Sequence, residues 1–432
     1  MPRGLQCLYR AGRAGNKRQG NFVFSGKPAP ILLSRQGRAR YVQTDFRGIF
    51  EMHMNNVEHV ALLGFGLAVA FGAIANKTNF CTMGAVSDWV NIGDTGRLRA
   101  WFLAIGIAVL GSQALQGLGY VDLGQSIYLT TNFGWLGNLV GGFLFGVGMT
   151  LGSGCGQRTL VRVGGGNLKS LVVMLMLGIT AATTLYGVLA LVRIHYIEVT
   201  NFNLSSHGMA NQGLDSVIVA LTGIKNAKLV HWVVTGLLGG GLVLFAFASR
   251  DFRKSFDNIL AGAFIGLAVV AAWYITGKIG HDDFNPIPVE SFTFVAPISD
   301  ALQYVMTFTG STIKFSVAAV GGVIAGSFIY AVVSRKFRIE TFTSRSDMVN
   351  HITGGALMGF GGIVGLGCTI GQGVTGVSTL AVGSMITLIM IIFGSALTMK
   401  VQYYMMDEQG FFHALFSGLA DFRLFPRKKP AY

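Results

Sequence analysis

Long apolar stretches recur along the whole chain and constrain its fold more than any other feature. Only 12% of the 432 residues are charged, about half the share found in soluble domains. Several stretches reach the roughly 20 residues that a helix needs to cross a bilayer. We therefore predict an all-α polytopic membrane protein with about nine full transmembrane helices. The stretches lie at about residues 57–75, 100–119, 134–151, 169–192, 229–249, 258–276, 301–333, 352–367 and 379–399.

Three of the apolar stretches end in a short break that contains Gly or Asn and leads to a cysteine. These cysteines are Cys81, Cys155 and Cys368. Irregular backbone at membrane depth is tolerated only where it is buried in protein or lines a polar cavity. The breaks therefore predict re-entrant half-helices that meet inside the membrane.

An internal repeat relates two of the breaks. Residues 141–155 align without a gap with residues 354–368, and eight of the fifteen positions are identical. A fainter match of residues 66–69 to 266–269 places His281 opposite Cys81, although His281 reads more simply as part of a loop. Gly-interrupted apolar segments at matching places in two halves point to a transporter site near the bilayer midplane. We predict two inverted repeats, residues 57–193 and 229–405, joined by a connector at 194–228.

Most of the positive charge lies outside these halves. The chain carries a formal charge of +14, and residues 1–50 contribute +9 of it, through ten Lys or Arg and one acid. This segment has no nucleic-acid motif, so we expect no nucleic-acid partner. We interpret residues 1–51 as a basic disordered tail or a misassigned start, with an Arg-rich targeting sequence as the weaker reading. Residues 406–432 are expected to form a C-terminal tail.

The residues around the breaks suit an anion. A half-helix that begins after Cys155 would point free backbone N–H groups and a partial positive charge at the break. Thr and Gln side chains can donate hydrogen bonds to anion oxygens. Buried cysteine can also be a plain small hydrophobe, but three of them in matching breaks favour a site. The predicted substrate pathway comprises Cys81, Thr82, Gly154, Cys155, Gln157, Gly367, Cys368, Thr369 and Gln372.

Charged residues near the breaks are open to two readings. Arg158 and Arg162 could form a basic rim of the pathway or anchor the helix at the membrane interface. Asp88 reads first as a helix-end partner. The loop around Arg335–Arg345 resembles a cytoplasmic loop. Arg250–Lys254 is also basic, so the count of Lys and Arg in loops leaves the orientation of the chain in the membrane open.

Two other functional classes remain possible. A membrane thiol oxidoreductase or sulfurtransferase would need a close cysteine pair or an activated thiolate, and the sequence has no C-x-x-C motif. A soft-metal transporter would use Cys and Met ligands, but only Met83 of the 16 methionines lies near a cysteine in sequence. We expect a transporter rather than an enzyme, with no cofactor and no bound metal.

The motifs resemble those of the YeeE/YedE family of bacterial sulfur transporters. The resemblance rests on Asn79–Ala85 with Asp88 and Trp89, on Gly141–Gly148 leading to Gly152–Cys155, and on Gly354–Cys368. It covers about residues 57–405 and implies thiosulfate uptake across the bacterial inner membrane, through an hourglass-like inverted-repeat fold. It also implies that Cys81, Cys155 and Cys368 line the pathway, and that a TusA-like sulfurtransferase could be a cytoplasmic partner. The long basic tail departs from the family pattern.

Thiosulfate has oxygens at one end and a large polarisable sulfur at the other. A neutral thiol can give that sulfur a weak S–H hydrogen bond, while N–H groups and hydroxyls hold the oxygens. Each station must bind weakly enough to release the ion to the next. This predicts a relay along the three cysteines in which no covalent bond forms.

Overall fold

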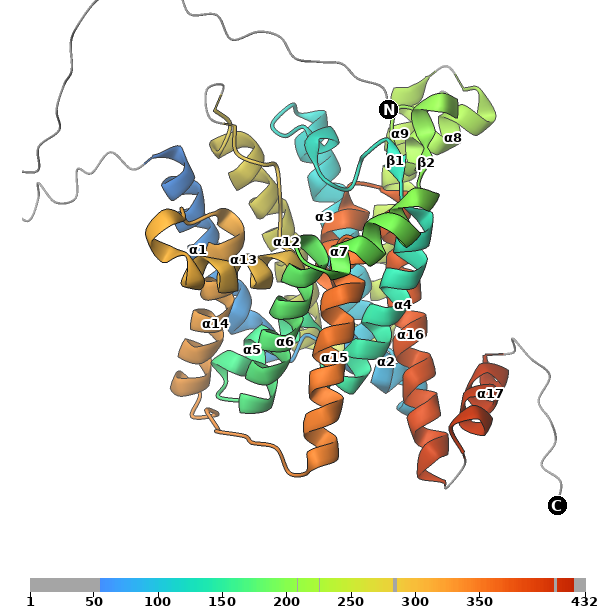
Figure 1. Ribbon diagram of the computed structural model, residues 1–432. Coiled ribbons are helices and arrows are strands. Elements are labelled where there is room, and N and C mark those ends of the chain that lie inside the picture. Colours follow the sequence, from blue (N-terminus) through green and yellow to red (C-terminus); the bar gives the residue numbers. More distant parts are fainter. Residues whose placement is uncertain (1–54, 208, 225, 283–285, 408–409, 423–432) are drawn as a thin grey trace, which may run out of the picture. The chain divides into compact units, whose positions relative to one another are not determined.

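Long helices standing side by side form the body of the molecule (Figure 1). The computed structural model describes residues 55–422 except 208, 225, 283–285, 408 and 409; the predicted tail 1–51 lies outside the described residues. Within the described part, eight helical spans are long and apolar enough to cross a membrane. The prediction of an all-α polytopic membrane protein is therefore confirmed. The spans are Asn56–Ile92, Gly96–Gly117, Trp135–Gly164, Leu168–Leu185, Ala227–Phe247, Phe256–Ile279, Phe315–Val333 and Val382–Met406.

One further long helix, α15 (Arg345–Val364), is less apolar than these eight. It packs between α4 (Trp135–Leu151) and α6 (Leu168–Leu185). Because protein covers much of its surface, α15 can carry glycine and polar residues that a lipid-facing helix would avoid. The sequence-based count of about nine helices included this segment as residues 352–367.

Helices of one predicted half pack mainly against helices of the other half. Helix α1 (Asn56–Thr78) packs on α14 (Phe315–Val333), and α3 (Gly96–Gly117) packs on α12 (Phe256–Tyr274). In the same way, α4 packs on α16 (Val382–Met406), and α6 packs on α15. Each half therefore finds its main partners in the other half.

Glycines let α4 and α15 approach closely. A Cβ atom on Gly141 would lie 2.7 Å from the carbonyl oxygen of Gly361, and one on Gly354 would lie 2.7 Å from the carbonyl oxygen of Gly148. Gly142 and Gly355 make matching approaches to α16 and α6. Small residues allow such backbone contact between membrane helices. Glycines of the repeated segments therefore lie where these helices touch.

The backbone breaks where the sequence predicts. Asn79, Ser153 and Leu366 adopt left-handed φ values of 52°, 57° and 59°. Cys81 and Cys155 are then the extended N-cap residues of α2 (Thr82–Ser87) and α5 (Gly156–Gly164). After Cys368 the chain re-enters a helix that includes a π-helical segment, Gly371–Gly376. Three half-helices thus begin at the three predicted cysteines.

Shorter elements complete the described part of the chain. In the predicted connector, β2 (Phe202–Asn203) pairs antiparallel with β1 (Asn132–Phe133). Within the predicted C-terminal tail, α17 (Phe411–Asp421) is a helix that packs on α16. The remaining α-helices are α7 (Leu189–Val192), α8 (Leu214–Thr222), α9 (Ala227–Thr235), α10 (Gly241–Phe247), α11 (Arg250–Lys254) and α13 (Val295–Met306).

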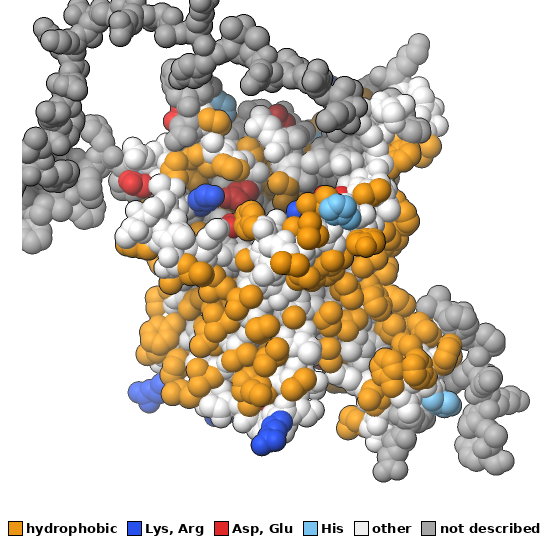
Figure 2. Space-filling view, viewed as in Figure 1, with side chains coloured by type: hydrophobic (Ala, Val, Ile, Leu, Met, Phe, Trp, Pro, Cys, Tyr) orange, Lys and Arg blue, Asp and Glu red, His pale blue; other side chains and the backbone are white. Residues whose placement is uncertain are grey.

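Basic residues gather at one end of the bundle, which we name the basic end. Lys77, at the end of α1, lies 5.9 Å from the ring of Phe256 at the start of α12, and Arg99 bonds the carbonyl oxygen of Phe245 at the end of α10. Helices α1 and α14 run parallel, so the residues after α14 lie at the same end. Figure 2 shows apolar side chains around the middle of the bundle and Lys or Arg at its lower edge. The basic end carries Lys77, Arg97, Arg99, Lys169, Arg250, Arg253, Lys254, Arg335, Lys336, Arg338, Arg345 and Lys400.

Candidate functional site

The breaks bring cysteines from distant parts of the chain together. The thiol of Cys81 interacts with the thiol of Cys155. Both are buried, and Cys155 is wholly inaccessible. Thr369, which follows Cys368 in the other half of the chain, also lies against the Cys155 thiol. The first and second halves therefore meet at Cys155.

Cys368 lies in a more aromatic environment. Its sulfur accepts a hydrogen bond from the backbone N–H of Gly371 at 3.3 Å. The side chain of Thr293 interacts with both Cys368 and the hydroxyl of Tyr128. Sequence analysis did not single out Thr293 or Tyr128, because both lie in irregular segments without a repeated motif. Only the fold places them beside the second break.

These contacts form a continuous series through the protein. It runs from Tyr128 and Thr293 to Cys368, then through Thr369 to Cys155 and Cys81. Tyr128 follows the end of α3, whereas Cys81 precedes α2, whose far end packs against Arg97 at the basic end. The three predicted cysteines therefore belong to one connected group of buried residues.

Several polar atoms around the Cys81–Cys155 pair are buried without a hydrogen-bond partner in the described part of the chain. They are Thr82 Oγ1, Gln157 Nε2 and Thr369 Oγ1. Leaving a buried donor or acceptor unpaired costs about 1–3 kcal/mol, so such groups mark places where water or a ligand completes the bonding. The Cys155 thiol contacts Gln157 Oε1 at 3.9 Å, which leaves the amide nitrogen of Gln157 free to donate. These groups suit the oxygens of an anion.

Gln372 and the break glycines make close contacts within the breaks. The side-chain nitrogen of Gln372 donates to the carbonyl oxygen of Gly365 at 2.6 Å, so this amide fixes the second break and its nitrogen is already used. Gly367 has a φ of 156°, and a Cβ there would lie 3.2 Å from Gln372. Gly154 packs against the stem of Arg158 in the same manner. These contacts fix the backbone at the breaks, and the predicted place of the three residues in the pathway stays a prediction.

Arginine side chains lie beside the break before Cys81 and the break before Cys155. Arg158 donates to the side-chain oxygen of Asn79 at 2.9 Å, and Arg162 donates to the carbonyl oxygen of Ser153 at 2.7 Å. Arg97 is ion-paired with Asp88 and lies over Gly84 of α2. Both arginines of the predicted basic rim thus bond to break residues. Asp88 is a helix-end partner, as its first reading suggested.

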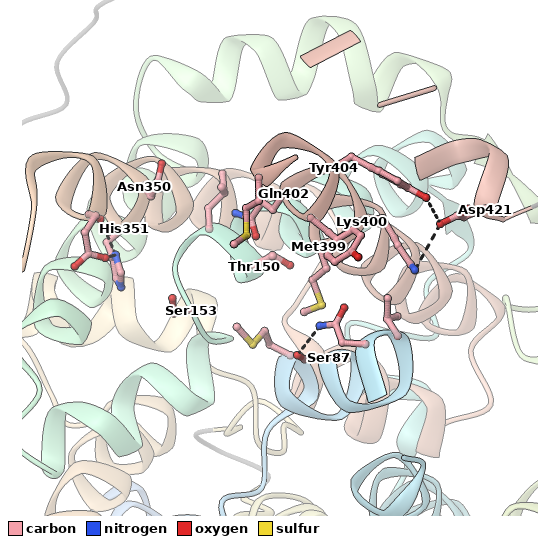
Figure 3. Close-up of a pocket in the computed structure, with 17 residues that line it drawn as sticks. Ser87, Thr150, Ser153, Asn350, His351, Met399, Lys400, Gln402, Tyr404 and Asp421 are labelled. Atoms are coloured by element: carbon pink, nitrogen blue, oxygen red, sulfur yellow. Dashed lines mark hydrogen bonds and ion pairs between the residues drawn. The ribbon is translucent and has the colours of Figure 1, made fainter. Parts of the chain in front are cut away.

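A polar pocket of about 730 Å³ opens at the basic end, next to the break before Cys155 (Figure 3). Met83 and Ser87 of α2 line it, together with Ser153 of the break and His351 of α15. On its other side, Asp421 of α17 accepts a hydrogen bond from Tyr404 at 2.8 Å and lies 3.5 Å from Lys400. Because Ser153 belongs to both the pocket and the break, the pocket adjoins the Cys81–Cys155 pair.

Comparisons with known proteins agree with this geometry. The family model described as Sulphur transport matches residues 77–397. The thiosulfate transporter TsuA of Escherichia coli strain K12 is 25% identical over 356 residues, which cover 80% of this chain and 93% of that protein. TsuA of Spirochaeta thermophila is 23% identical over 338 residues, covering 77% and 95%. The relatives are named as transporters, in line with the expectation of a transporter rather than an enzyme. The resemblance drawn from the sequence is confirmed: the chain is a multi-pass protein of the bacterial inner membrane, and it belongs to the Sulphur transport family.

Proposed function

We propose that the protein takes up thiosulfate or a closely related sulfur-containing anion. The observation that carries this proposal is the set of buried unpaired groups beside Cys155, where the two halves of the chain meet. An anion with oxygens at one end and sulfur at the other would satisfy these groups and the neutral thiols together. The names of the two TsuA relatives support the same substrate.

The ion passes from Cys368 to Cys155 and then to Cys81 by exchanging weak hydrogen bonds. Thr369 and Gln157 hold its oxygens at the middle station, and Arg158 attracts it toward the first break. Because each contact is weak, the ion can leave each station for the next. The thiols stay protonated, since a thiolate would repel the anion.

Uptake runs toward the basic end. Cytoplasmic loops of membrane proteins carry an excess of Lys and Arg, and Arg250, Arg253 and Lys254, which left the sequence count open, share an end with Arg335–Arg345. The polar pocket beside Ser153 then becomes the cytoplasmic exit. The TusA-like sulfurtransferase implied by the family resemblance would receive the anion there.

The two halves form an inverted repeat. Three features support this part of the proposal. Helices of one half pair with helices of the other, and Gly141 and Gly354 each lie against backbone of the opposite half. The left-handed residues Ser153 and Leu366 each stand two positions before a cysteine. The repeat places one break from each half at the centre, as in transporters whose substrate lies between half-helices.

The contact between the Cys81 and Cys155 thiols also supplies the close pair that a thiol oxidoreductase would need. A small thiol reagent distinguishes the two functions. Neutral, buried pathway thiols react slowly at pH 7, whereas an activated redox pair reacts quickly.

Purified protein in proteoliposomes tests the proposed function. We expect saturable uptake of radiolabelled thiosulfate that excess unlabelled thiosulfate competes with and sulfate competes with poorly. Liposomes without protein are the control. Uptake no faster than in empty liposomes, or equal competition by sulfate, would contradict the proposal.

A further inference from the structure

An acidic residue, Glu290, lies near the outer part of the cysteine series. The hydroxyl of Thr276, at the end of the α12 span, donates to the carbonyl oxygen of Glu290 at 2.6 Å and accepts from its N–H at 3.2 Å. Ser291 then bonds the carbonyl oxygen of Val269 in α12 at 2.9 Å. These bonds fix the segment that places Thr293 against Cys368. The backbone of Glu290 is therefore held firmly, three residues from a pathway contact.

The Glu290 carboxylate has no compensating partner. Among the described residues it makes no hydrogen bond and no ion pair. The charges that act on it are Asp300 of α13 and Lys314, which precedes α14. Lys278, on the segment that carries Thr276, is exposed.

Glu290 in turn acts on the pathway. Its charge is felt at the buried hydroxyl of Tyr128. That hydroxyl lies 3.5 Å from the point that a Cβ on Gly371 would occupy, and Gly371 donates its N–H to Cys368. An ionised Glu290 would consequently oppose the arrival of an anion at Cys368.

Moving thiosulfate inward requires energy. A cell interior is electrically negative, and each charge moved across 100 mV corresponds to about 2.3 kcal/mol. A dianion that enters alone works against this potential, whereas each proton that enters with it cancels one charge. We propose, on the basis of the proposed function, that Glu290 binds a proton that accompanies the anion into the pathway.

The acid strength of Glu290 fits this role. Burial and the nearby Asp300 raise the pKa of Glu290 to about 7, and Lys314 opposes them only in part. The carboxyl group is thus mostly protonated at pH 6 and mostly ionised at pH 8. Thiosulfate itself stays a dianion over this range, so a pH effect reports on the protein.

Proteoliposomes that enclose a pH-sensitive dye test the proposal. We expect wild-type uptake of thiosulfate to acidify the lumen and to slow about tenfold between external pH 6 and 8, as one group of pKa about 7 requires. Glu290→Gln should lose both the acidification and the pH dependence, whereas Glu290→Asp should keep both. Glu58→Gln, which changes an exposed acid in the first turn of α1, should behave as wild type.

The size-exclusion profile of each variant checks that it is folded. Thiosulfate counterflow, measured without a pH gradient or a membrane potential, separates the two proposals. If wild-type protein shows counterflow but no acidification, or if Glu290→Gln acidifies the lumen normally, the proton site is wrong. If wild-type protein shows no counterflow, the proposed function itself fails.

Discussion

The break between α4 and α5 and the break after α15 share a backbone plan but differ in charge. Each has a left-handed residue two positions before a buried cysteine, and each lies against glycines of the other half. Beside the first of these breaks, Arg162 bonds to Ser153. Arg158, which follows this break on α5, bonds to Asn79 of the break between α1 and α2. The second break has Thr293 and Tyr128 beside it. The same backbone plan can thus form two proposed stations. The side chains around each break make one station basic and the other neutral.

The largest effects should come from the two equivalent cysteines. We expect Cys155→Ala and Cys368→Ala each to abolish thiosulfate-dependent growth, because each removes one station of the relay. Cys7→Ala, in the predicted basic tail, is the matched control and should grow normally. Membrane abundance of every variant should be measured by immunoblot. Full uptake by either pathway variant would refute the relay and end the functional equivalence of the breaks.

Arginine substitutions test the difference between the stations. A hydrogen bond to a charged group contributes about 1.5–3 kcal/mol, so Arg158→Gln should lower the uptake rate at low thiosulfate roughly 10- to 100-fold. Lys254→Gln removes an exposed cation of α11 at the same end of the bundle, away from the breaks, and should have little effect. Initial rates at several ionic strengths provide the measurement. Equal losses in the two variants would mean that general basic charge at this end, rather than the break, governs uptake.

Glycine substitutions test the likeness of the two breaks. Gly141→Ala and Gly354→Ala each force a Cβ against backbone of the opposing helix, and overpacking of this kind costs about 1–3 kcal/mol. Gly66→Ala has no neighbour within 4 Å and should be neutral or stabilising by up to about 1 kcal/mol. Thermal unfolding in detergent measures all three. A lowered Tm for only one of the first two would show that the halves do not pack equivalently.

The smallest effect is expected far from both breaks, where Asp215 of α8 bonds His231 of α9 at 2.8 Å. Burial raises the pKa of Asp215, but the hydrogen bonds from His231 and backbone N–H groups outweigh it and hold the pKa below its ordinary value. Because the folded pKa is depressed, this stabilisation is present above about pH 4 and is lost as the pH falls through the folded value.

His231→Gln should therefore reduce stability at pH 7 by at most about 1 kcal/mol and weaken its acid dependence. Thermal unfolding between pH 3 and 7 measures both effects. Uptake at pH 7 should be unchanged. A marked loss of uptake would show that this outer region takes part in transport, and would contradict a pathway confined to the breaks.

The fold class and the central cysteines could be predicted from the sequence because apolar length and the Gly–Cys repeat are local patterns. Residues 141–155 and 354–368 revealed both breaks without any structure. Tyr128, Thr293 and Glu290 could not be found this way, since only tertiary packing brings their irregular segments to Cys368. The free amide nitrogen of Gln157 and the occupied one of Gln372 likewise depend on rotamers and partners, although both residues follow a cysteine at a break.

A crystal structure with thiosulfate, in which long-wavelength anomalous scattering locates the sulfur atoms, tests the central claim most directly. Our account predicts an anion sulfur beside the Cys155 thiol, with its oxygens within hydrogen-bond distance of Gln157 Nε2 and Thr369 Oγ1. Thiosulfate found only in the polar pocket at the basic end, with the Cys155 site empty, would contradict it.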